Sequence, residues 1–404
     1  MDSAYKMRLA LGIAGNSSNT TYRLVHGEGD NLPGLVIDCY GPTAVMQAHS
    51  VGMHVCRMEI AKALKKVMGE ALESIYYESE TTLPYKADLR QENGFILGGD
   101  ADDVAVENGL KFHIDWLRGQ KTGFFVDQRE NRSLLEHYAK GKSVLNMFCY
   151  TGGFSVYAMR GEAKAVHSVD SSAKAIELTN ENIALNFPED ARHEAICEDA
   201  FKYLDEHDQQ YDLIVLDPPA FAKHRAALRN ALKGYTRLNV KGLQRIKKGG
   251  ILFTFSCSQV VTKDQFRNAV FTAAAQAGRK VRILHQLHQP ADHPINIYHP
   301  EGEYLKGLVL YEYRLLLIHS LIILRLLHDI FHVLLSCRGC INLHKLSTGS
   351  VSYDLCQSSL SGARRPVKDD GAELIGFNRT IQKLVLPNYV LLPDHLIKCC
   401  RTHP

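Results

Sequence analysis

Short apolar runs and longer amphipathic stretches alternate along the chain from about residue 113 to residue 314. The apolar runs have the length of buried strands, and the stretches between them carry apolar residues at helical spacing. We expect strands at Ser143–Phe148, Ala165–Asp170, Glu194–Cys197, Leu213–Leu216, Ile251–Phe255, Val281–Leu287 and Leu305–Tyr311. We expect helices at Ser172–Leu185, Arg225–Ile246 and Lys263–Ala277. This alternation predicts βαβ units and a largely parallel sheet.

The first part of the chain, up to about residue 112, has a different pattern. Turn residues bracket short alternating segments there, as in Gly27–Gly34, which is followed by Leu35–Asp38. One helix is expected near Val55–Met68, where apolar residues recur at helical spacing. Hairpins with a single helix predict a small mixed α+β domain over residues 21–112, preceded by a linker at residues 1–20.

The alternation ends near residue 311, and residues 315–404 show no clear periodicity. Leu315–Cys337 is strongly apolar, but an arginine and an aspartate interrupt it, and charged side chains are costly at the centre of a bilayer. Cys337, Cys340 and His344 have the spacing of half a zinc site, but no second pair completes it. We therefore expect a poorly structured extension, with neither a membrane span nor a metal.

The composition is that of a globular protein. Of the 404 residues, 45% are hydrophobic and 23% are charged, which allows a sizeable buried core. The formal net charge of +3 is too small to predict nucleic-acid binding, so any RNA contact needs local basic patches. The ten cysteines lack the spacing of a disulfide framework and follow no secretory signal, which favours a reduced, cytoplasmic protein.

Glycines and acids follow the first strands of the αβ region. Gly152-Gly153 leads into a helix, where the backbone can approach a ligand and free N–H groups are available. Asp170 ends the second strand, where an acid typically accepts hydrogen bonds from ribose, and Asp199 is placed to meet an adenine amino group. Each acid alone fits a helix N-cap. Together with Asp217, acids at successive strand ends favour a nucleoside-bearing cofactor, although the dinucleotide fingerprint is absent.

Two further motifs place reactive side chains at strand ends. The segment Asp217–Phe221 follows the strand Leu213–Leu216, and Phe255–Ser258 ends the next expected strand. In open α/β sheets, ligands bind in the crevice outside the carboxyl ends of the strands. A carboxylate (Asp217) and a thiol (Cys257) brought to one crevice predict covalent chemistry rather than binding alone.

Several of these segments resemble a known family. Asn146–Phe154, Asp170, Asp217–Phe221 and Ser256–Ser258 are similar to motifs of the class I S-adenosylmethionine-dependent methyltransferases. More narrowly, the chain resembles the large-subunit ribosomal RNA (cytosine-C5) methyltransferases that consist of a PUA domain, an EEHEP domain and a methyltransferase domain. The segments that carry this narrower resemblance are Tyr22–Gly41, Gly119–Arg132, Asp292–Pro294 and Glu301–Lys306. The resemblance covers about residues 20–312.

The resemblance implies a Rossmann-like domain at residues 113–314 with a seven-stranded, mainly parallel sheet, preceded by the EEHEP-like α+β domain. It also implies S-adenosyl-L-methionine as the cofactor and large-subunit ribosomal RNA as the partner. The cofactor-binding residues would be Asn146, Phe148, Tyr150, Gly152, Asp170, Asp199 and Asp217. The RNA-binding PUA domain has no counterpart, because only Met1–Asn19 precede the second domain, so residues 1–20 would be its remnant.

The implied reaction needs a nucleophile, because carbon 5 of cytosine is unreactive while the ring is aromatic. Cys257 is the candidate, since a thiolate that adds to carbon 6 makes carbon 5 enamine-like. Asp217 would hold and polarise the base at its amino group and N3, and Phe221 would offer a stacking face. Glu301 and Glu303 are candidates for removing the C5 proton.

Basic residues near these motifs are candidates for RNA contacts. Lys223 and Arg225 lie next to the proposed crevice in the sequence, and Lys121 and Arg129 precede the first strand. Cations also recur at four-residue steps, at Arg225, Arg229, Lys233, Arg237, Lys241 and Arg245. Such a row is either a solvated helix face, which is the default, or a stripe that follows phosphates. The target base would have to leave its stack to reach a strand-end thiol.

Two other functions stay open from the sequence alone. A related RNA methyltransferase that acts on a guanine or an exocyclic nitrogen would share the Gln120–Phe125 segment, but it would need no cysteine nucleophile. A catalytically idle RNA-binding or ribosome-assembly protein would bind no S-adenosylmethionine. A need for Cys257 would distinguish cytosine-C5 methylation from nitrogen methylation. Binding of S-adenosylmethionine would distinguish an enzyme from a catalytically idle protein.

Overall fold

The computed structural model describes residues 1–313, apart from 84–88, 90–92 and 100–102, together with 389–392 and 395–398. The chain forms two compact units, Met1–Arg314 and Leu315–Pro404. The expectations for the apolar stretch Leu315–Cys337 and for the half zinc site after it lie outside the described residues. Within the described part, no helix is long and apolar enough to cross a membrane. In the second unit, β15 (Tyr389–Leu392) pairs with β16 (His395–Lys398) as an antiparallel hairpin.

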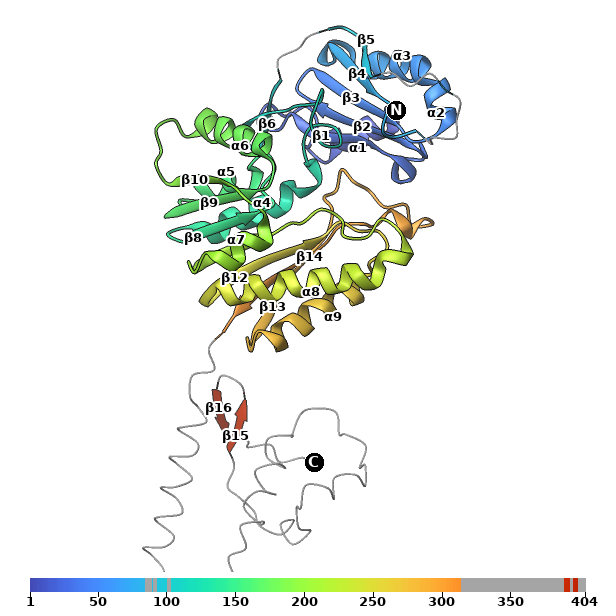
Figure 1. Cartoon of the computed structure of the whole chain (residues 1–404). Coiled ribbons are helices and arrows are strands. Elements are labelled where there is room, and N and C mark those ends of the chain that lie inside the picture. The colour runs from blue at the N-terminus through green and yellow to red at the C-terminus, as the bar shows by residue number, and fades with distance from the viewer. Residues whose placement is uncertain (84–88, 90–92, 100–102, 314–388, 393–394, 399–404) are drawn as a thin grey trace, which may run out of the picture. The chain divides into compact units, whose positions relative to one another are not determined.

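The first unit begins with a five-stranded sheet and three helices (Figure 1). The strands, in spatial order, are β1 (Thr21–His26), β2 (Leu35–Tyr40), β3 (Thr43–Ala48), β4 (Ser74–Glu78) and β5 (Gly94–Leu97). Only β3 and β4 pair in parallel in this sheet. The helices are α1 (Asp2–Ala10), α2 (Val51–Val55) and α3 (Arg57–Met68). Apolar residues from both layers form one core, so the expected small α+β domain is confirmed.

Helix α1 lies in the segment that the sequence assigns to a linker. Arg8 on this helix is fully buried. Its guanidinium donates to both carboxylate oxygens of Asp30, at 2.5 and 2.8 Å, and to the main-chain oxygen of Asp292, at 2.7 Å. Through Arg8, this helix is therefore joined to the segment after β1 and to the region of Asp292, so residues 2–10 form a packed helix within the first unit.

After a hairpin of β6 (Val104–Glu107) and β7 (Leu110–His113), the chain forms a seven-stranded sheet. Its strands are β8 (Ser143–Met147), β9 (Ala165–Asp170), β10 (His193–Cys197), β11 (Tyr211–Leu216), β12 (Ile246–Ser256), β13 (Val281–Leu287) and β14 (Lys306–Glu312). The spatial order is β10-β9-β8-β11-β12-β14-β13. All neighbours pair in parallel except β14, which is antiparallel to β12 and β13. The predicted mainly parallel sheet is confirmed.

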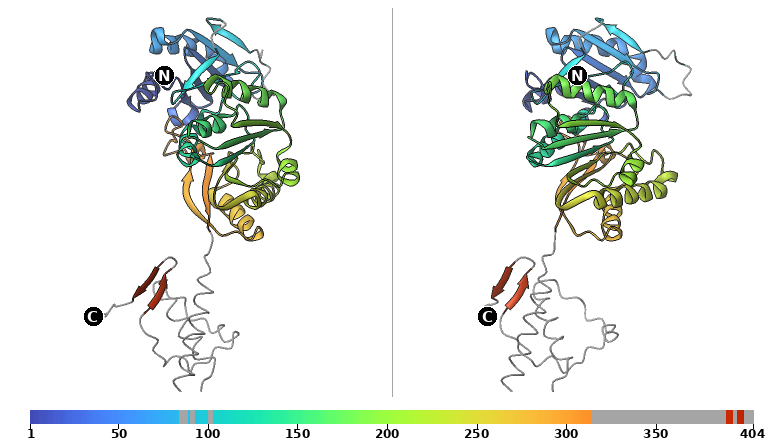
Figure 2. Two further views of the ribbon diagram at one scale, coloured as in Figure 1. Left: turned by 90° about the vertical axis from the view of Figure 1, so that its left-hand side faces the viewer. Right: turned by 60° about the vertical axis from the view of Figure 1, so that its left-hand side comes forward.

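Helices cover both faces of this sheet (Figures 1 and 2). They are α4 (Arg129–Ala139), α5 (Gly153–Arg160), α6 (Ala173–Asn186), α7 (Ala200–Glu206), α8 (Leu228–Arg245) and α9 (Lys263–Gln276). Leu213 and Val215 of β11 pack in one core with α4, α5 and α6. Ile214 and Leu216 pack in the other core, with α7, α8 and α9. A strand that is buried on both faces explains the continuous apolar run in the sequence.

Most element limits agree with the prediction from periodicity. β9 and β13 have the predicted limits, whereas β12 begins at Ile246 rather than Ile251, with an irregular pairing to β11 at this point. Short 3-10 turns occur at Gly27–Asp30, Gly69–Ala71, Val126–Gln128, Arg225–Ala227 and Pro300–Gly302. Helix α4 escaped prediction because its buried face includes Arg129, Asn131 and Arg132 rather than apolar residues alone.

A buried ion pair joins three parts of the first unit. Arg129 of α4 donates to both carboxylate oxygens of Asp292, at 2.9 and 3.1 Å, and both side chains are almost fully buried. Asp292 lies in the connection between β13 and β14, and it also accepts from the main-chain N–H of Arg23 on β1, at 3.0 Å. The small sheet, α4 and the β13–β14 connection therefore meet at one carboxylate.

We expect Asp292→Ala to lower the free energy of unfolding by about 3–5 kcal/mol, because it leaves the Arg129 guanidinium buried without its partner. Urea titration followed by circular dichroism measures the change. The matched control is Asp208→Ala, which removes a fully exposed aspartate from its ion pair with Arg245 and should leave the curve almost unchanged. Equal effects of the two substitutions on the free energy of unfolding would show that the buried Arg129–Asp292 pair has no special role in stability.

Candidate active site

The pairing of β11 with β12 brings the two reactive side chains together. Leu216 lies opposite Thr254 in parallel register, so both strands end at the same edge of the sheet. Asp217 and Cys257 follow directly and line one cavity of about 230 Å³. Its other lining residues are Gln120, Lys121, Phe124, Phe125, Asp127, Gln128, Arg132, Phe148, Cys149, Tyr150, Thr151, Gly153, Phe154, Asp170, Ser171, Ser172, Pro218, Pro219 and Leu305. The crevice predicted at the strand ends therefore exists.

The loop after β8 has an uncommon backbone. Phe148, Tyr150 and Gly152 adopt positive φ angles of 58°, 48° and 75°. Bulky residues rarely adopt this conformation, and such backbone tends to occur at functional sites. A Cβ atom at Gly152 would lie 2.6 Å from the Thr179 side chain, so glycine is required there. The main-chain N–H of Tyr150 donates to Asp170 at 3.0 Å, which joins this loop to the end of β9.

The residues expected to bind the cofactor divide into two groups. Phe148, Tyr150, Asp170 and Asp217 line the cavity, and Gly152 precedes the lining residue Gly153. The other two expected residues, Asn146 and Asp199, lie outside the lining.

Asn146 is buried, and its amide donates to Ser155 at 2.9 Å. Asp199 is the N-cap of α7 and accepts from the main-chain N–H groups of Phe201 and Lys202, at 2.9 and 3.0 Å. One oxygen of the Asp199 carboxylate therefore caps the helix, as the N-cap alternative predicted, and its role toward a cofactor stays a prediction.

Asp217 lies in an environment that disfavours its charge. Burial, followed by the negative charge of Asp127, raises the pKa of the Asp217 carboxyl to about 7. The amide of Gln128 donates to Asp217 Oδ2 at 2.9 Å, and Asn131 in turn donates to Gln128 at 2.6 Å. The carboxyl group is thus fixed in orientation and available in its protonated form near neutral pH.

Cys257 is held by the serines on either side of it. Ser256 Oγ donates to the Tyr235 hydroxyl on α8 at 3.0 Å, and Ser258 Oγ donates to the main-chain oxygen of Ala222 at 2.5 Å. The Cys257 thiol lies 3.9 Å from the main-chain oxygen of Pro218. Burial and the nearby Asp217 carboxyl raise the pKa of the Cys257 thiol to about 11. The thiol is therefore well positioned and protonated at rest.

Lys306 is a site residue that sequence reasoning did not single out. Its side chain is buried and donates from Nζ to the main-chain oxygen of Ser258 at 2.6 Å. Burial lowers the pKa of the Lys306 ammonium to about 8, and the nearby Cys257 opposes this shift. In the sheet, Lys306 pairs with Ser256. A buried cation therefore fixes the loop that carries the thiol.

Asp127 was also missed, although it lies within the segment Gly119–Arg132 that carried the resemblance. Its Oδ2 accepts from the Tyr304 hydroxyl at 2.6 Å, while its buried Oδ1 has no partner among the described residues. Burial opposes ionisation, but Lys121 and other positive neighbours outweigh it and lower the pKa of Asp127 to about 2. The cavity thus contains a permanent carboxylate with one free acceptor.

The small sheet supports this segment directly. Thr122 Oγ donates to Asp38 of β2 at 2.6 Å, and the Tyr40 hydroxyl lies 2.8 Å from the same Thr122 oxygen. Asp38 also accepts from Arg23 at 2.7 and 2.8 Å. The first domain therefore contributes to the site by fixing the loop that carries Lys121 and Asp127.

The residues expected to contact the RNA lie in different environments. Lys121 lines the cavity, with its ammonium 4.7 Å from the Phe125 ring centre. Lys223 and Arg225 are exposed on the loop after β11. Arg129 is buried in the ion pair with Asp292, so its guanidinium is not available to a phosphate.

Other expected contacts lie outside the cavity lining. Phe221 packs against Tyr235, with ring centres 4.7 Å apart, rather than in the cavity. Glu301 pairs with His299 and Glu303 pairs with Lys263, and neither glutamate lines the cavity.

The cavity fits an adenosyl cofactor with a methionine group. Asp170 closes β9 at the edge where ribose is expected, and aromatic rings of Phe125, Phe148 and Tyr150 line the walls. The free Oδ1 of Asp127 is a partner for an amino group. Within the described part of the chain, no group of His, Cys, Asp and Glu residues is arranged to bind a metal ion.

Comparisons with known proteins agree with this geometry. A family model described as S-adenosylmethionine-dependent methyltransferase matches residues 82–298. Ribosomal RNA large subunit methyltransferase I from Tolumonas auensis is 44% identical over 296 residues, which are 72% of this chain and 74% of that protein. The protein of the same name from Aeromonas hydrophila is 42% identical over 304 residues, 74% of this chain and 76% of that protein.

Solved structures show the same fold. A protein described as a SAM-dependent methyltransferase from Streptococcus mutans has a TM-score of 0.68 at 27% identity, covering 77% of this chain and 79% of its own. A methyltransferase in complex with SAH has a TM-score of 0.67 at 27% identity, covering 76% and 79%. The chain therefore belongs to the S-adenosylmethionine-dependent methyltransferase family, with the class I fold and S-adenosylmethionine as its cofactor, and its relatives are ribosomal RNA large subunit methyltransferase I proteins.

Proposed function

We propose that the protein methylates carbon 5 of a cytosine in large-subunit ribosomal RNA through a covalent adduct with Cys257. The observation that carries this proposal is the placement of the Cys257 thiol and the Asp217 carboxyl in one cavity with the loop after β8. A transfer to a nitrogen atom would need no thiol at this position, because nitrogen carries its own lone pair. The names of the relatives support ribosomal RNA as the substrate.

In the proposed mechanism, the Cys257 sulfur adds to carbon 6 of the cytosine while Asp217 gives its proton to N3. The negative charge that develops in the ring is thereby neutralised, and carbon 5 becomes an enamine carbon. S-adenosylmethionine supplies the methyl group to this carbon. When solvent water takes the C5 proton, the electron pair of the C5–H bond forms the C5–C6 double bond and the carbon–sulfur bond breaks, which releases Cys257 as a thiolate. Asp217 takes back the proton from N3 in the same step.

Three residues assist this pair. Lys306 fixes the main chain at Ser258, while Lys121 is the positive neighbour that lowers the pKa of the Cys257 thiol and so favours the thiolate. Asp127 offers its free Oδ1 as an acceptor, either for the amino group of the methyl donor or for the amino group of the cytosine. The positive charge of Lys121 lowers the pKa values of both Asp127 and Asp217.

We expect Cys257→Ala to abolish methylation of an unmodified large-subunit ribosomal RNA transcript, with a loss of more than about 10³-fold, since the variant has no nucleophile. The measurement is transfer of a labelled methyl group, followed by identification of the modified nucleoside. The matched control is Cys56→Ala, which removes an exposed cysteine on the small domain. Retained activity in Cys257→Ala would favour nitrogen methylation and would contradict the covalent mechanism.

An RNA that contains 5-fluorocytosine tests the adduct itself. Fluorine cannot leave as a cation, so the enzyme–RNA bond persists and the complex migrates slowly on a denaturing gel. We expect this complex with the wild type and with Cys56→Ala, and none with Cys257→Ala. Calorimetric titration with S-adenosylmethionine should give equal affinities for the three proteins, which separates loss of chemistry from loss of folding.

The pH dependence of kcat/KM should show which form of Asp217 acts. The proposal needs Asp217 protonated and Cys257 ionised, with pKa values of about 7 and about 11. The fraction of enzyme in this form increases about tenfold per pH unit below pH 7. Above pH 7 the fraction stays constant, because the gain in Cys257 thiolate cancels the loss of protonated Asp217. We therefore expect a plateau between pH 7 and pH 8. A continued tenfold rise over this interval would show that Asp217 acts as a carboxylate.

We expect Lys306→Met to slow formation of the 5-fluorocytosine complex by about 10–100-fold, because the loop that carries the thiol loses its fixing bond. The affinity for S-adenosylmethionine should not change. Lys306→Arg, which keeps a donor and the charge, should recover part of the rate. Complex formation at the wild-type rate in Lys306→Met would show that the bond to Ser258 is not needed.

A further inference from the structure

The row of cations along α8 divides into two halves with different surroundings. The half toward the C-terminus contacts α7: Lys241 pairs with Asp205, and Arg245 pairs with Asp208 at 2.8 Å. Arg237 lies over the Phe201 ring, 4.1 Å from its centre. Lys241 and Arg245 therefore belong to the contact with α7, whereas Arg237 stays exposed and also faces the space between α8 and α9.

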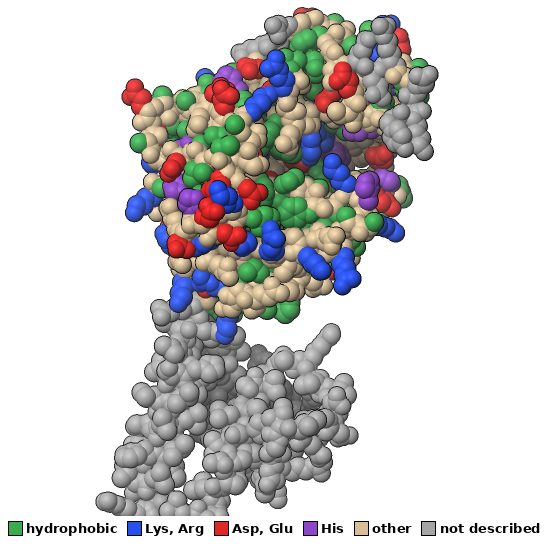
Figure 3. Space-filling model, in the orientation of Figure 1, with side chains coloured by type: hydrophobic (Ala, Val, Ile, Leu, Met, Phe, Trp, Pro, Cys, Tyr) green, Lys and Arg blue, Asp and Glu red, His purple; other side chains and the backbone are tan. Residues whose placement is uncertain are grey.

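The other half of the row has no such partners. Arg225, Arg229 and Lys233 are exposed, and no ion pair or hydrogen bond joins their side chains to any described residue. Figure 3 shows Lys and Arg side chains over the part of the surface where α8 lies. With Lys223 just before them, these cations lead from the loop that carries Asp217 along the first half of α8.

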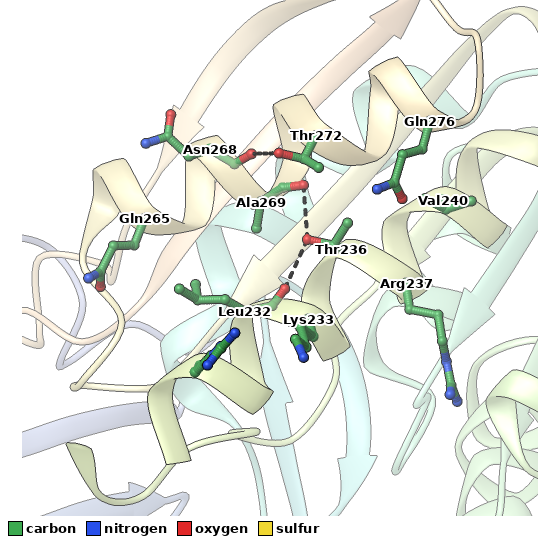
Figure 4. A pocket seen from close by; sticks show the side chains of 11 residues that line it. Leu232, Lys233, Thr236, Arg237, Val240, Gln265, Asn268, Ala269, Thr272 and Gln276 are labelled. Atoms are coloured by element: carbon green, nitrogen blue, oxygen red, sulfur yellow. Dashed lines mark hydrogen bonds between the residues drawn. The ribbon is translucent and has the colours of Figure 1, made fainter. Parts of the chain in front are cut away.

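A groove of about 650 Å³ runs beside these cations, between α8 and α9 (Figure 4). Arg229, Lys233 and Arg237 line it from α8, and no aspartate or glutamate belongs to its lining. The amide side chains on the α9 side are Gln265, Asn268 and Gln276. The lining thus combines cations and uncharged amides with apolar side chains such as Leu232 and Val240, and its positive charge repels cations and attracts anions.

The groove is built on a rigid base that belongs to the active site. Thr236 donates to the main-chain oxygens of Leu232, at 2.9 Å, and of Ala269 on α9, at 3.4 Å, so the two helices are fixed to each other. Tyr235, the neighbour of Thr236 on α8, accepts from Ser256, the neighbour of Cys257. The helix that carries the cations is therefore joined to the strand end that carries the thiol.

We propose that the groove between α8 and α9 binds the sugar–phosphate backbone of the RNA strand that flanks the target nucleotide. Arg229 and Lys233 contact phosphates, and the amides of α9 contact phosphate or ribose oxygens. The cations from Arg229 to Arg237 extend along about two helical turns, roughly 11 Å, which is long enough for more than one phosphate. The proposal rests on RNA being the substrate, but it is independent of which base atom is methylated.

The test is the salt dependence of RNA binding by the full chain. The probe is a fluorescein-labelled 20-nucleotide oligocytidine RNA, and fluorescence anisotropy gives Kd between 50 and 300 mM KCl. Each phosphate contact contributes about 0.7 to the slope of log K against log salt for a single strand. We expect the double variant Arg229→Gln and Lys233→Gln to bind more weakly and to have a slope smaller by about 1.4.

The matched control removes two other exposed lysines, Lys66 on α3 and Lys248 at the opposite end of β12, by the same change to glutamine. This control should keep the wild-type slope, although the net charge falls by the same amount. An unchanged slope in the groove variant would overturn the proposal and would favour an acidic protein partner for this surface. Equal reductions in both variants would also overturn it, because they would show an effect of total charge.

The outcome does not depend on the covalent mechanism. If Cys257→Ala stays active while the groove variant has a smaller slope of log K against log salt, the covalent cytosine mechanism is wrong and the RNA-binding groove is supported. If Cys257→Ala is inactive while the groove variant binds RNA like the wild type, the chemistry stands and the groove proposal fails. Thermal unfolding of the groove variant should match the wild type, because Arg229 and Lys233 are exposed.

Discussion

The site depends on the parallel pairing of two neighbouring strands, β11 and β12. Because Leu216 lies opposite Thr254, the loops that follow these strands leave the sheet side by side. Buried bonds then join the two loops to each other and to their supports, through Ser258 to Ala222 and through Lys306 to Ser258. A carboxyl group and a thiol thus meet by virtue of the backbone, and little side-chain entropy is lost when they act together.

Burial and the carboxyl groups of the cavity keep the thiol protonated. Burial raises the pKa values of Asp217 and Cys257 most, the carboxylate of Asp127 adds to both shifts, and Lys121 opposes them. A thiol that is protonated and buried reacts slowly with oxidants, since the thiolate is the reactive form. The same surroundings raise the pKa of the Asp217 carboxyl to about 7, so this group is partly protonated at neutral pH.

Local sequence patterns predicted the sheet, the strand-end crevice and the pairing of Asp217 with Cys257, because each depends on periodicity and on the geometry of parallel strands. They did not predict the environment of Arg129, whose partner Asp292 lies far along the chain. They gave Asp199 both a ligand role and a helix-cap role, of which the structure shows the cap, and the ligand role stays a prediction. Lys306 and Asp127 were missed because their importance comes from burial and neighbours, which no spacing reveals.

The order of strands in the large sheet has a consequence for biosynthesis. β14 is the last strand in sequence, yet it lies between β12 and β13 and supplies Lys306. While the chain is being made, β12 keeps an open edge until residues 306–312 have left the ribosome, and an open edge is prone to wrong pairing. The thiol loop therefore receives its fixing bond only after the whole sheet has been synthesised.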